Sequence, residues 1–302
     1  MSGLPRDVRF IERDWLNANH VLLLGAEQNI LIDTGFFSQV DETLRRLALP
    51  ENLGTGRLHR IVNTHCHCDH VGGNAALKSI YACEITVPKG EAEIVRQWDR
   101  KGLWLDYADH RGERFVLDSV MHDAERFHGA GLEWRAVAAP GHDMGAMMFY
   151  CEEEKLLISG DALWEQSFGL VLPDPPECLA AARAALESIA RLEIRHVLPG
   201  HGKVFSNVTE ALDRAFKRVE YFAQDPERLA RHAIKAMFGF TLLDRGRMPL
   251  ATLPEYLERV PGFAALNAKY LHMSAEELAQ WMVSQLEKAG AAKREDGWLV
   301  SQ

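Results

Sequence analysis

A chain of 302 residues is longer than a usual single domain, and its 47% content of hydrophobic residues is enough for a large buried core. A net charge of −9 argues against a general nucleic-acid-binding surface. The first residues lack the apolar core of a signal peptide, and no apolar run approaches the roughly 20 residues of a membrane helix. We therefore expect a soluble, cytoplasmic protein that does not associate with membranes.

Strands are predicted over residues 8–37, at the amino-terminal end of the chain. The apolar runs 21–24 and 29–32 flank a four-residue segment with glycine, which is typical of a β-hairpin. Ser38 is a candidate cap for a helix whose apolar residues recur at helical spacing, and Pro50 is expected to end that helix.

The stretch Thr64–His70 then places three imidazoles and one carboxylate close together: His65, His67, Asp69 and His70. These groups are the ligands that zinc-like divalent cations take. The apolar run 58–63 predicts a strand before the cluster, and residues 71–77 predict a helix after it. Side chains alternate along an extended segment, so His65 and His67 point the same way, whereas the two interleaved cysteines point away and are expected to pack in the core. One turn can therefore supply two neighbouring metal sites.

A strand over 81–87 and a helix over 91–100 are predicted next. The segment 98–114 mixes aromatic and charged residues, and we expect it to be an insertion that leans over the metal site. Three of its side chains are candidate substrate contacts: Trp104, Tyr107 and His110. A surface helix hairpin that packs its own aromatic residues is the alternative.

Three further candidate ligands each follow an apolar run and have a glycine neighbour: His142, Asp161 and His201. Glycine lets the backbone turn sharply, and loops at strand ends can hold metal ligands on a rigid scaffold. Trp164 follows Asp161 closely and is a candidate substrate contact, with a core role as the alternative. Asp174 is a candidate cap for a helix that ends near Leu192.

The tail from about Asp225 is predicted to be mostly helical. Helices are expected over 227–238, 252–259, 264–271 and 274–288, followed by a hairpin over 292–301. Ser274 and Glu277 form the pattern of a capping box. We expect two domains, 1–222 and 223–302.

Helices followed by a terminal hairpin resemble a winged-helix module, which often binds DNA. The tail from Asp225 carries ten basic and ten acidic residues, whereas phosphate binding normally needs a basic face. The neutral balance favours a packing, pocket-closing or homodimer-forming role over nucleic-acid binding.

Five motifs, taken together and in order, resemble those of the metallo-β-lactamase superfamily, in its hydroxyacylglutathione-hydrolase-like (glyoxalase II-like) group. They are Ile30–Gly35, the His65–His70 cluster, Pro140–His142, Gly160–Asp161 and Pro199–Gly202. The resemblance covers roughly residues 8–220. It implies an α+β fold, the αββα four-layer sandwich, with the helical tail as a separate module. It also implies that Asp33 supports the metal-binding loop from behind, although a simple turn role for Asp33 is equally open.

The resemblance implies a centre with two divalent cations, with zinc favoured and iron or manganese as alternatives. We assign His65, His67 and His142 to one cation, Asp69, His70 and His201 to the other, and Asp161 as a bridge between them. A metal-bridging hydroxide would then be the nucleophile. Asp69 would act as the catalytic residue that orients the hydroxide and carries a proton.

These features predict a hydrolase that cleaves a thioester, a lactone or a related ester in a small-molecule substrate. The alternatives are a metal-dependent nuclease or phosphodiesterase of the same fold, and a metal-bound sensor without enzymatic activity. True β-lactamases of this fold lack a bridging aspartate, so Asp161 argues against antibiotic hydrolysis. The related diiron oxygen reductases have glutamate where His67 stands, which argues against redox chemistry. The single-iron persulfide dioxygenases share much of the motif.

Overall fold

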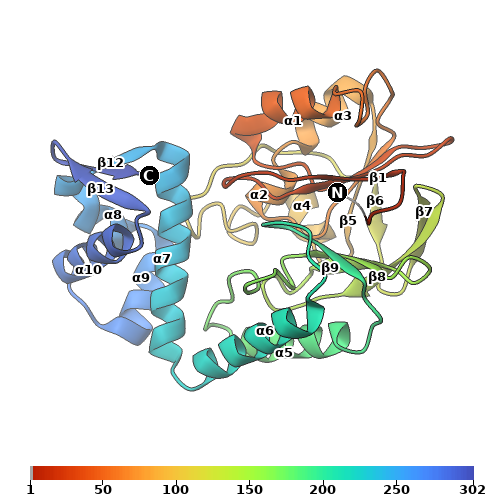
Figure 1. The fold of residues 1–302 in the computed structure, drawn as a ribbon. Coiled ribbons are helices and arrows are strands. Elements are labelled where there is room, and N and C mark those ends of the chain that lie inside the picture. Colours follow the sequence, from red (N-terminus) through yellow and green to blue (C-terminus); the bar gives the residue numbers. More distant parts are fainter. Residues whose placement is uncertain (1–2) are drawn as a thin grey trace. The chain divides into compact units, whose positions relative to one another are not determined.

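The chain divides into two units in the computed structural model, which describes residues 3–302 (Figure 1). The first unit runs up to Asp99 and continues over Arg111–Glu220. The second unit combines Arg100–His110 with Tyr221–Gln302. The predicted boundary at residue 222 does not anticipate this arrangement, because Arg100–His110 belongs to the second unit although it lies far from Tyr221 in the sequence.

The first unit contains two sheets. The six strands of the first sheet follow chain order: β1 (Val8–Ile11), β2 (His20–Leu23), β3 (Ile30–Ile32), β4 (Arg60–Val62), β5 (Glu84–Pro88) and β6 (Ser119–Met121). The second sheet has the order β11 (His196–Pro199), β10 (Leu156–Gly160), β9 (Met147–Cys151), β8 (Leu132–Ala138) and β7 (Arg126–Gly129). Strands β3 to β6 run parallel, as do β10 and β11, and the other neighbours are antiparallel.

The two sheets pack face to face around one apolar core. Side chains such as Val21, Ile30 and Val62 from the first sheet form a cluster with Trp134 and Phe149 from the second. Strand alternation explains this core, because every second residue of each strand points to the inner face.

Helices cover the outer faces of both sheets. Helices α5 (Glu177–Ile189) and α6 (Val208–Ala223) pack on the outer face of the second sheet through a second apolar cluster. Helices α1 (Val40–Leu47) and α3 (Asn74–Tyr81) lie on the side of the first sheet (Figure 1). The layers are therefore helix, sheet, sheet, helix, and the predicted αββα fold is confirmed.

Several predicted boundaries are wrong by a few residues. Ser38 lies in a short 3-10 turn (Phe37–Gln39), and α1 begins without a side-chain cap. Asp174 does not cap α5, because Pro176 is the residue that precedes the helix. The strand predicted from residue 81 begins at Glu84, because α3 continues through Tyr81. Side-chain capping patterns are short, and the surrounding packing decides whether they are used.

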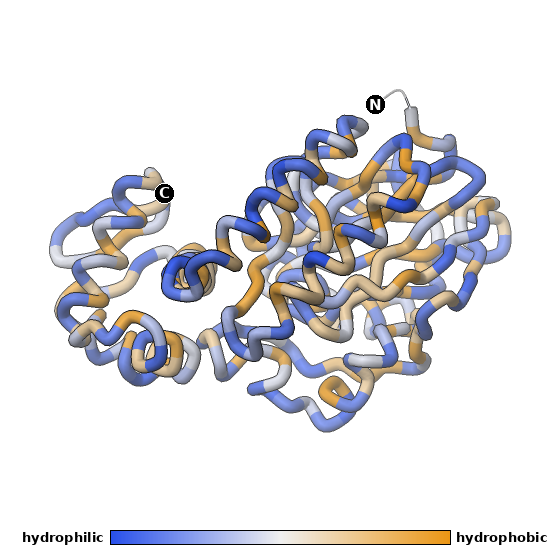
Figure 2. The backbone as a smooth tube through the Cα atoms, turned by 90° about the horizontal axis from the view of Figure 1, so that it is seen from below, coloured by the Kyte–Doolittle hydropathy of each residue, from blue (hydrophilic) through white to orange (hydrophobic). Residues whose placement is uncertain are grey.

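The second unit is mostly helical. Its longer helices are α7 (Pro226–Arg245), α8 (Leu253–Arg259), α9 (Pro261–Leu266) and α10 (Ala275–Lys288), and its three-stranded sheet has the order β12 (Arg247–Pro249), β14 (Trp298–Ser301), β13 (Ala292–Glu295). The capping box of Ser274 and Glu277 and the terminal hairpin are confirmed. Figure 2 shows hydrophobic and hydrophilic residues alternating along the helices, as expected for helices with one buried face. Within residues 3–302, no helix has both the length and the apolar character needed to cross a membrane.

The segment Arg100–His110 forms turns held by hydrogen bonds within the second unit, and not the helix hairpin considered as an alternative. The amide of Gly262 donates to the carbonyl oxygen of Tyr107 at 2.8 Å. The hydroxyl of Thr241 donates to the carbonyl oxygen of Ala108 at 3.2 Å. The hydroxyl of Tyr256 donates to the carboxylate of Asp109 at 2.8 Å. The helices of the tail therefore hold a segment that is distant in the sequence.

Candidate metal centre

The seven predicted ligand residues come from the ends of four strands of the first unit. The turn after β4 and the short helix α2 (Cys68–Val71) supply four of them, and the loops after β8, β10 and β11 supply one each. The structure brings all seven together: His65, His67, Asp69, His70, His142, Asp161 and His201. Groups that are far apart in the sequence therefore meet at one place.

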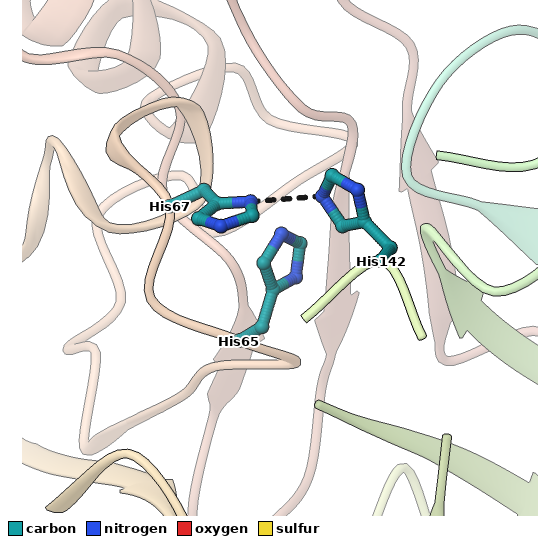
Figure 3. Close-up of side chains that lie close together, drawn as sticks. All are labelled: His65, His67 and His142. Carbon is teal, nitrogen blue, oxygen red and sulfur yellow. Dashed lines mark hydrogen bonds between the residues drawn. The ribbon is translucent and has the colours of Figure 1, made fainter. Parts of the chain in front are cut away.

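Three imidazoles form the first group of donors: His65, His67 and His142 (Figure 3). One nitrogen atom from each ring lies within 4.8 Å of the other two, and His67 Nδ1 lies 2.8 Å from His142 Nε2. His142 Nδ1 donates to the carbonyl oxygen of Leu170 at 2.5 Å, which leaves its Nε2 lone pair directed at the group. Burial lowers the pKa of His65 well below its usual value and that of His67 to about 3. Both rings are therefore neutral at physiological pH, as a metal ligand must be.

The second group combines one carboxylate with two imidazoles: Asp69, His70 and His201. The Oδ2 atom of Asp69 lies 3.2 Å from His201 Nε2 and 3.8 Å from His70 Nε2. Burial would raise the pKa of Asp69, but the neighbouring His70 and His201 outweigh it and lower the pKa to about 2. Asp69 is therefore ionised across the physiological pH range.

Asp161 lies between the two groups. Its Oδ2 atom is 3.4 Å from His142 Nε2, while its Oδ1 atom is 3.4 Å from His70 Nε2 and 3.8 Å from His201 Nε2. The side chain is buried, so its two oxygens face the two groups and not water. This is the arrangement expected of a carboxylate that shares its two oxygens between two cations.

The donors fit divalent cations. The Nε2 atoms of His65, His70 and His201 are buried and have no hydrogen-bond partner among residues 3–302. A buried polar atom without a partner is costly, so several at one place indicate a ligand. Imidazole nitrogen with carboxylate oxygen is a donor set typical of zinc and also open to iron or manganese.

Asp33 holds the ligand-bearing turn from behind. Its carboxylate accepts from the Thr64 amide at 2.9 Å, from the Thr64 hydroxyl at 2.7 Å and from His70 Nδ1 at 2.7 Å. The bond to His70 directs the other ring nitrogen, Nε2, toward the donor group. The structure therefore favours the supporting role of Asp33 over a simple turn role.

A second pair of carboxyl groups lies behind His67. The Oδ2 atom of Asp143 is 3.6 Å from His67 Nε2, and Oδ1 accepts from the Gly145 amide at 2.7 Å. Glu91 is buried beside Gly145, and burial together with nearby Asp143 raises the pKa of Glu91 well above its usual value. Sequence reasoning missed both residues. The position of Asp143 directly after His142 was a usable signal, whereas Glu91 offered none.

The loop Glu12–Asn19, between β1 and β2, supports two of the ligand loops. Sequence reasoning assigned strands to this region and missed the loop. The Asn19 side chain donates to the carbonyl oxygens of Pro199 at 3.0 Å and Gly202 at 2.8 Å, on either side of His201. The amide of Ala18 donates to the carbonyl oxygen of Asp69 at 3.0 Å.

Two indole rings lie at the side of His201. Trp15, from the same loop, stacks on the His201 ring with a centroid distance of 4.1 Å and an interplanar angle of 14°. Trp164 stands nearly perpendicular to His201 at 5.0 Å, and its Nε1 donates to Asp161 Oδ1 at 3.2 Å. The structure thus places Trp164 beside the ligands. The other predicted substrate contacts, Trp104, Tyr107 and His110, lie in the second unit, so their role stays a prediction.

Glycine permits the close packing of the ligand loops. A Cβ atom added at Gly200 would lie 2.2 Å from Asp161 Oδ1 and 3.0 Å from the backbone of Gly160. A Cβ atom added at Gly169 would lie 2.7 Å from the ring of His142 and 2.8 Å from the Cβ atom of Asp161. Residues with side chains at these positions would displace the ligands.

Solved structures share the fold of this chain. The metallo-beta-lactamase family protein TTHA1429 from Thermus thermophilus matches with a TM-score of 0.56 and 23% identity, and the match covers 98% of each chain. The FEZ-1 metallo-beta-lactamase from Legionella gormanii matches with a TM-score of 0.60 and 15% identity, covering 74% of this chain and 95% of the other. At these identities the likeness shows the fold alone.

Curated relatives match over part of their length. A lactamase-like protein, vrtG, of Penicillium aethiopicum is 31% identical over 64% of this chain and 54% of its own. A hydroxyacylglutathione hydrolase of Rhodospirillum rubrum is 28% identical over 59% of this chain and 62% of its own. An acyl-coenzyme A thioesterase, MBLAC2, of Bos taurus is 25% identical over 62% of this chain and 74% of its own. The chain thus spans less than two thirds of the first two relatives.

The sequence profile of the Metallo-beta-lactamase superfamily matches residues 13–201, which is more than half of the chain. The matched range contains every strand of the two sheets except β1, and all seven residues of the candidate centre. This chain belongs to the metallo-beta-lactamase superfamily.

Proposed function

We propose that this protein is a hydrolase that holds two divalent cations, zinc by preference, and cleaves a thioester, a lactone or a related ester. The position of Asp161 carries the proposal, because its two oxygens face two separate groups of donors. In this proposal His65, His67 and His142 hold one cation, and Asp69, His70 and His201 hold the other. The relatives named as a hydroxyacylglutathione hydrolase and an acyl-coenzyme A thioesterase support the reaction class.

When bound, the cations would act as Lewis acids that lower the pKa of a water molecule and polarise the substrate carbonyl. The residues of the chain would transfer the proton and orient the imidazoles. Asp69 is ionised, so its free oxygen can accept a proton from the attacking water and pass it to the departing thiol or alcohol. In the overall reaction the acyl carbon gains the oxygen of water and loses its bond to sulfur or oxygen. Asp33 and Asp143 keep the imidazoles oriented while this occurs.

The test combines metal analysis with a substrate panel. The purified protein should contain close to two metal ions per chain and should hydrolyse a thioester or a lactone faster than a phosphodiester. Asp161→Asn should lose metal and activity together, because one oxygen donor becomes an amide. Asp213→Asn changes an exposed aspartate on α6 in the same way and should change neither.

The results distinguish the proposal from its alternatives. Preferential cleavage of the phosphodiester would favour a nuclease or phosphodiesterase. Two bound metal ions without turnover of any substrate would favour a sensor. A single metal ion in the fully loaded protein, unaffected by Asp161→Asn, would contradict the shared carboxylate.

A further inference from the structure

Trp15 is a large apolar side chain that lies at the metal centre and is nevertheless exposed. Its relative exposure is 55%, although one face of its indole ring is stacked on His201 at 4.1 Å. The exposed area must therefore lie on the opposite face and the rim of the ring. Exposure of an indole ring to water costs free energy. A bound ligand that covers the ring would remove this cost.

Trp164 extends this apolar surface. The two indole centroids are 6.0 Å apart with an interplanar angle of 73°, so the rings form a corner beside His201. The hydrogen bond from Trp164 Nε1 to Asp161 and the bond from its amide to the carbonyl oxygen of Ser167, at 2.7 Å, fix the orientation of Trp164. A group bound in this corner would lie next to two of the metal ligands.

The chemistry of the corner selects what it can bind. Indole faces offer apolar area and a π surface, and the Nε1 donor of Trp164 is already used by Asp161. A cationic group is disfavoured, because the two carboxylates among the ligands would offset only half of the charge of two divalent cations. A leaving thiolate or alkoxide is also disfavoured there, because its developing charge needs a polar partner.

We propose that the Trp15–Trp164 pair is the subsite for the acyl portion of the substrate, and that this portion is neutral and apolar, with aromatic groups preferred. The inference rests on the proposed ester or thioester hydrolysis. In this inference Trp15 determines which acyl group is accepted, whereas the cations would activate the carbonyl of any acyl group.

The test compares thioesters that share one thiol and differ in the acyl group: acetyl, hexanoyl and phenylacetyl. In Trp15→Ala the ratio of kcat/KM for phenylacetyl to that for acetyl should fall about two- to tenfold, because an aromatic contact is lost. Trp15→Phe should recover most of the ratio. Ile80→Ala removes an apolar side chain that is 56% exposed on α3, and it should keep the parent ratio.

A binding measurement separates this inference from the proposed function. Phenylacetate, the product acid, should quench the indole fluorescence of the metal-loaded protein at lower concentration than acetate, and Trp15→Ala should remove the difference. Metal content is measured on every variant, because Trp15 also contacts His201. If Trp15→Ala lowered kcat/KM equally for the acetyl and phenylacetyl substrates, or changed neither value, the proposed subsite would be overturned. If neither a thioester nor a lactone nor a related ester is cleaved, the proposed function fails, and the quenching result alone decides whether the corner binds an apolar acid.

Discussion

Single residues behind the predicted ligands hold the imidazoles in place. Asp143 contacts His67 at the ring nitrogen opposite the one that faces His142. A carboxylate at this position fixes the ring orientation and makes the imidazole a stronger donor. Buried Glu91 lies behind Asp143, and burial together with the Asp143 carboxylate raises the pKa of Glu91 well above its usual value.

Asp143→Asn should weaken metal binding about 10- to 100-fold without preventing folding, because the amide keeps the shape of the side chain and loses its charge. Competition with a chromophoric chelator measures the affinity. Asp213→Asn is the matched control and should bind as tightly as the parent. Unchanged affinity in Asp143→Asn would show that the contact with His67 is incidental.

His20 should make the stability of the protein depend on pH. Burial, and next the nearby Arg13, lower the pKa of His20 well below its usual value, and Arg13 donates to its Nε2 atom at 2.7 Å. The unfolded chain takes up a proton near pH 6.5, whereas the folded chain does not. Stability is therefore lost as the pH falls below 6.5, by up to about 1.4 kcal/mol per pH unit for one such group.

Urea unfolding at pH 7.5 and pH 5.5, at equal metal content, measures this effect. His20→Gln removes the titrating ring, so the variant should lose less stability between the two pH values than the parent. The same loss in parent and variant would assign the pH dependence to other groups.

At the scale of strands and loops, the sequence predicts which side chains come together, because its signals are local. Each ligand loop follows a short apolar run and lies next to glycine, and the imidazoles before α2 follow strand alternation. The supporting loop Glu12–Asn19 has no periodic pattern, and its role depends on contacts with Pro199 and Asp69 that only the fold creates. The helix starts at Ser38 and Asp174 were predicted wrongly, because neighbouring backbone packing overrides a capping pattern.

The glycine at the end of β11 should be essential for metal binding. Gly200→Ala would place a Cβ atom 2.2 Å from Asp161 Oδ1, so the carboxylate must move and metal content should fall. Gly239→Ala is the matched control in the middle of α7, where the nearest neighbour of the new Cβ atom is 3.9 Å away. Gly239→Ala should leave the metal content of the parent unchanged and stabilise the helix by about 0.5–1 kcal/mol. Metal analysis and thermal unfolding of the two variants check both statements, and a fully loaded Gly200→Ala would contradict the close contact.

At the scale of the whole chain, the second unit depends on Arg100–His110 as well as on the tail. Leu103, Leu105 and Ala108 of this segment are buried. A compositional boundary near residue 222 is visible in the sequence, but a short segment held by helices from a distant region is not, because its contacts are nonlocal.

Deletion of residues 223–302 should therefore leave Arg100–His110 without its partners. Limited proteolysis with mass spectrometry should show cleavage in this segment in the truncated protein and protection in the full chain. Equal protection with and without the tail would show that the segment is held in another way.

The hydrogen bonds of Tyr107, Ala108 and Asp109 to α7, α8 and α9 also bear on the order of folding during synthesis. A ribosome adds about 5–20 residues per second, so this segment emerges roughly 7 to 30 seconds before the helices that hold it. Until then its leucines are available to other chains or to chaperones. Helices α7, α8 and α9 thus complete a structure that begins at residue 100, and loss of these helices would expose a segment more than 100 residues before them.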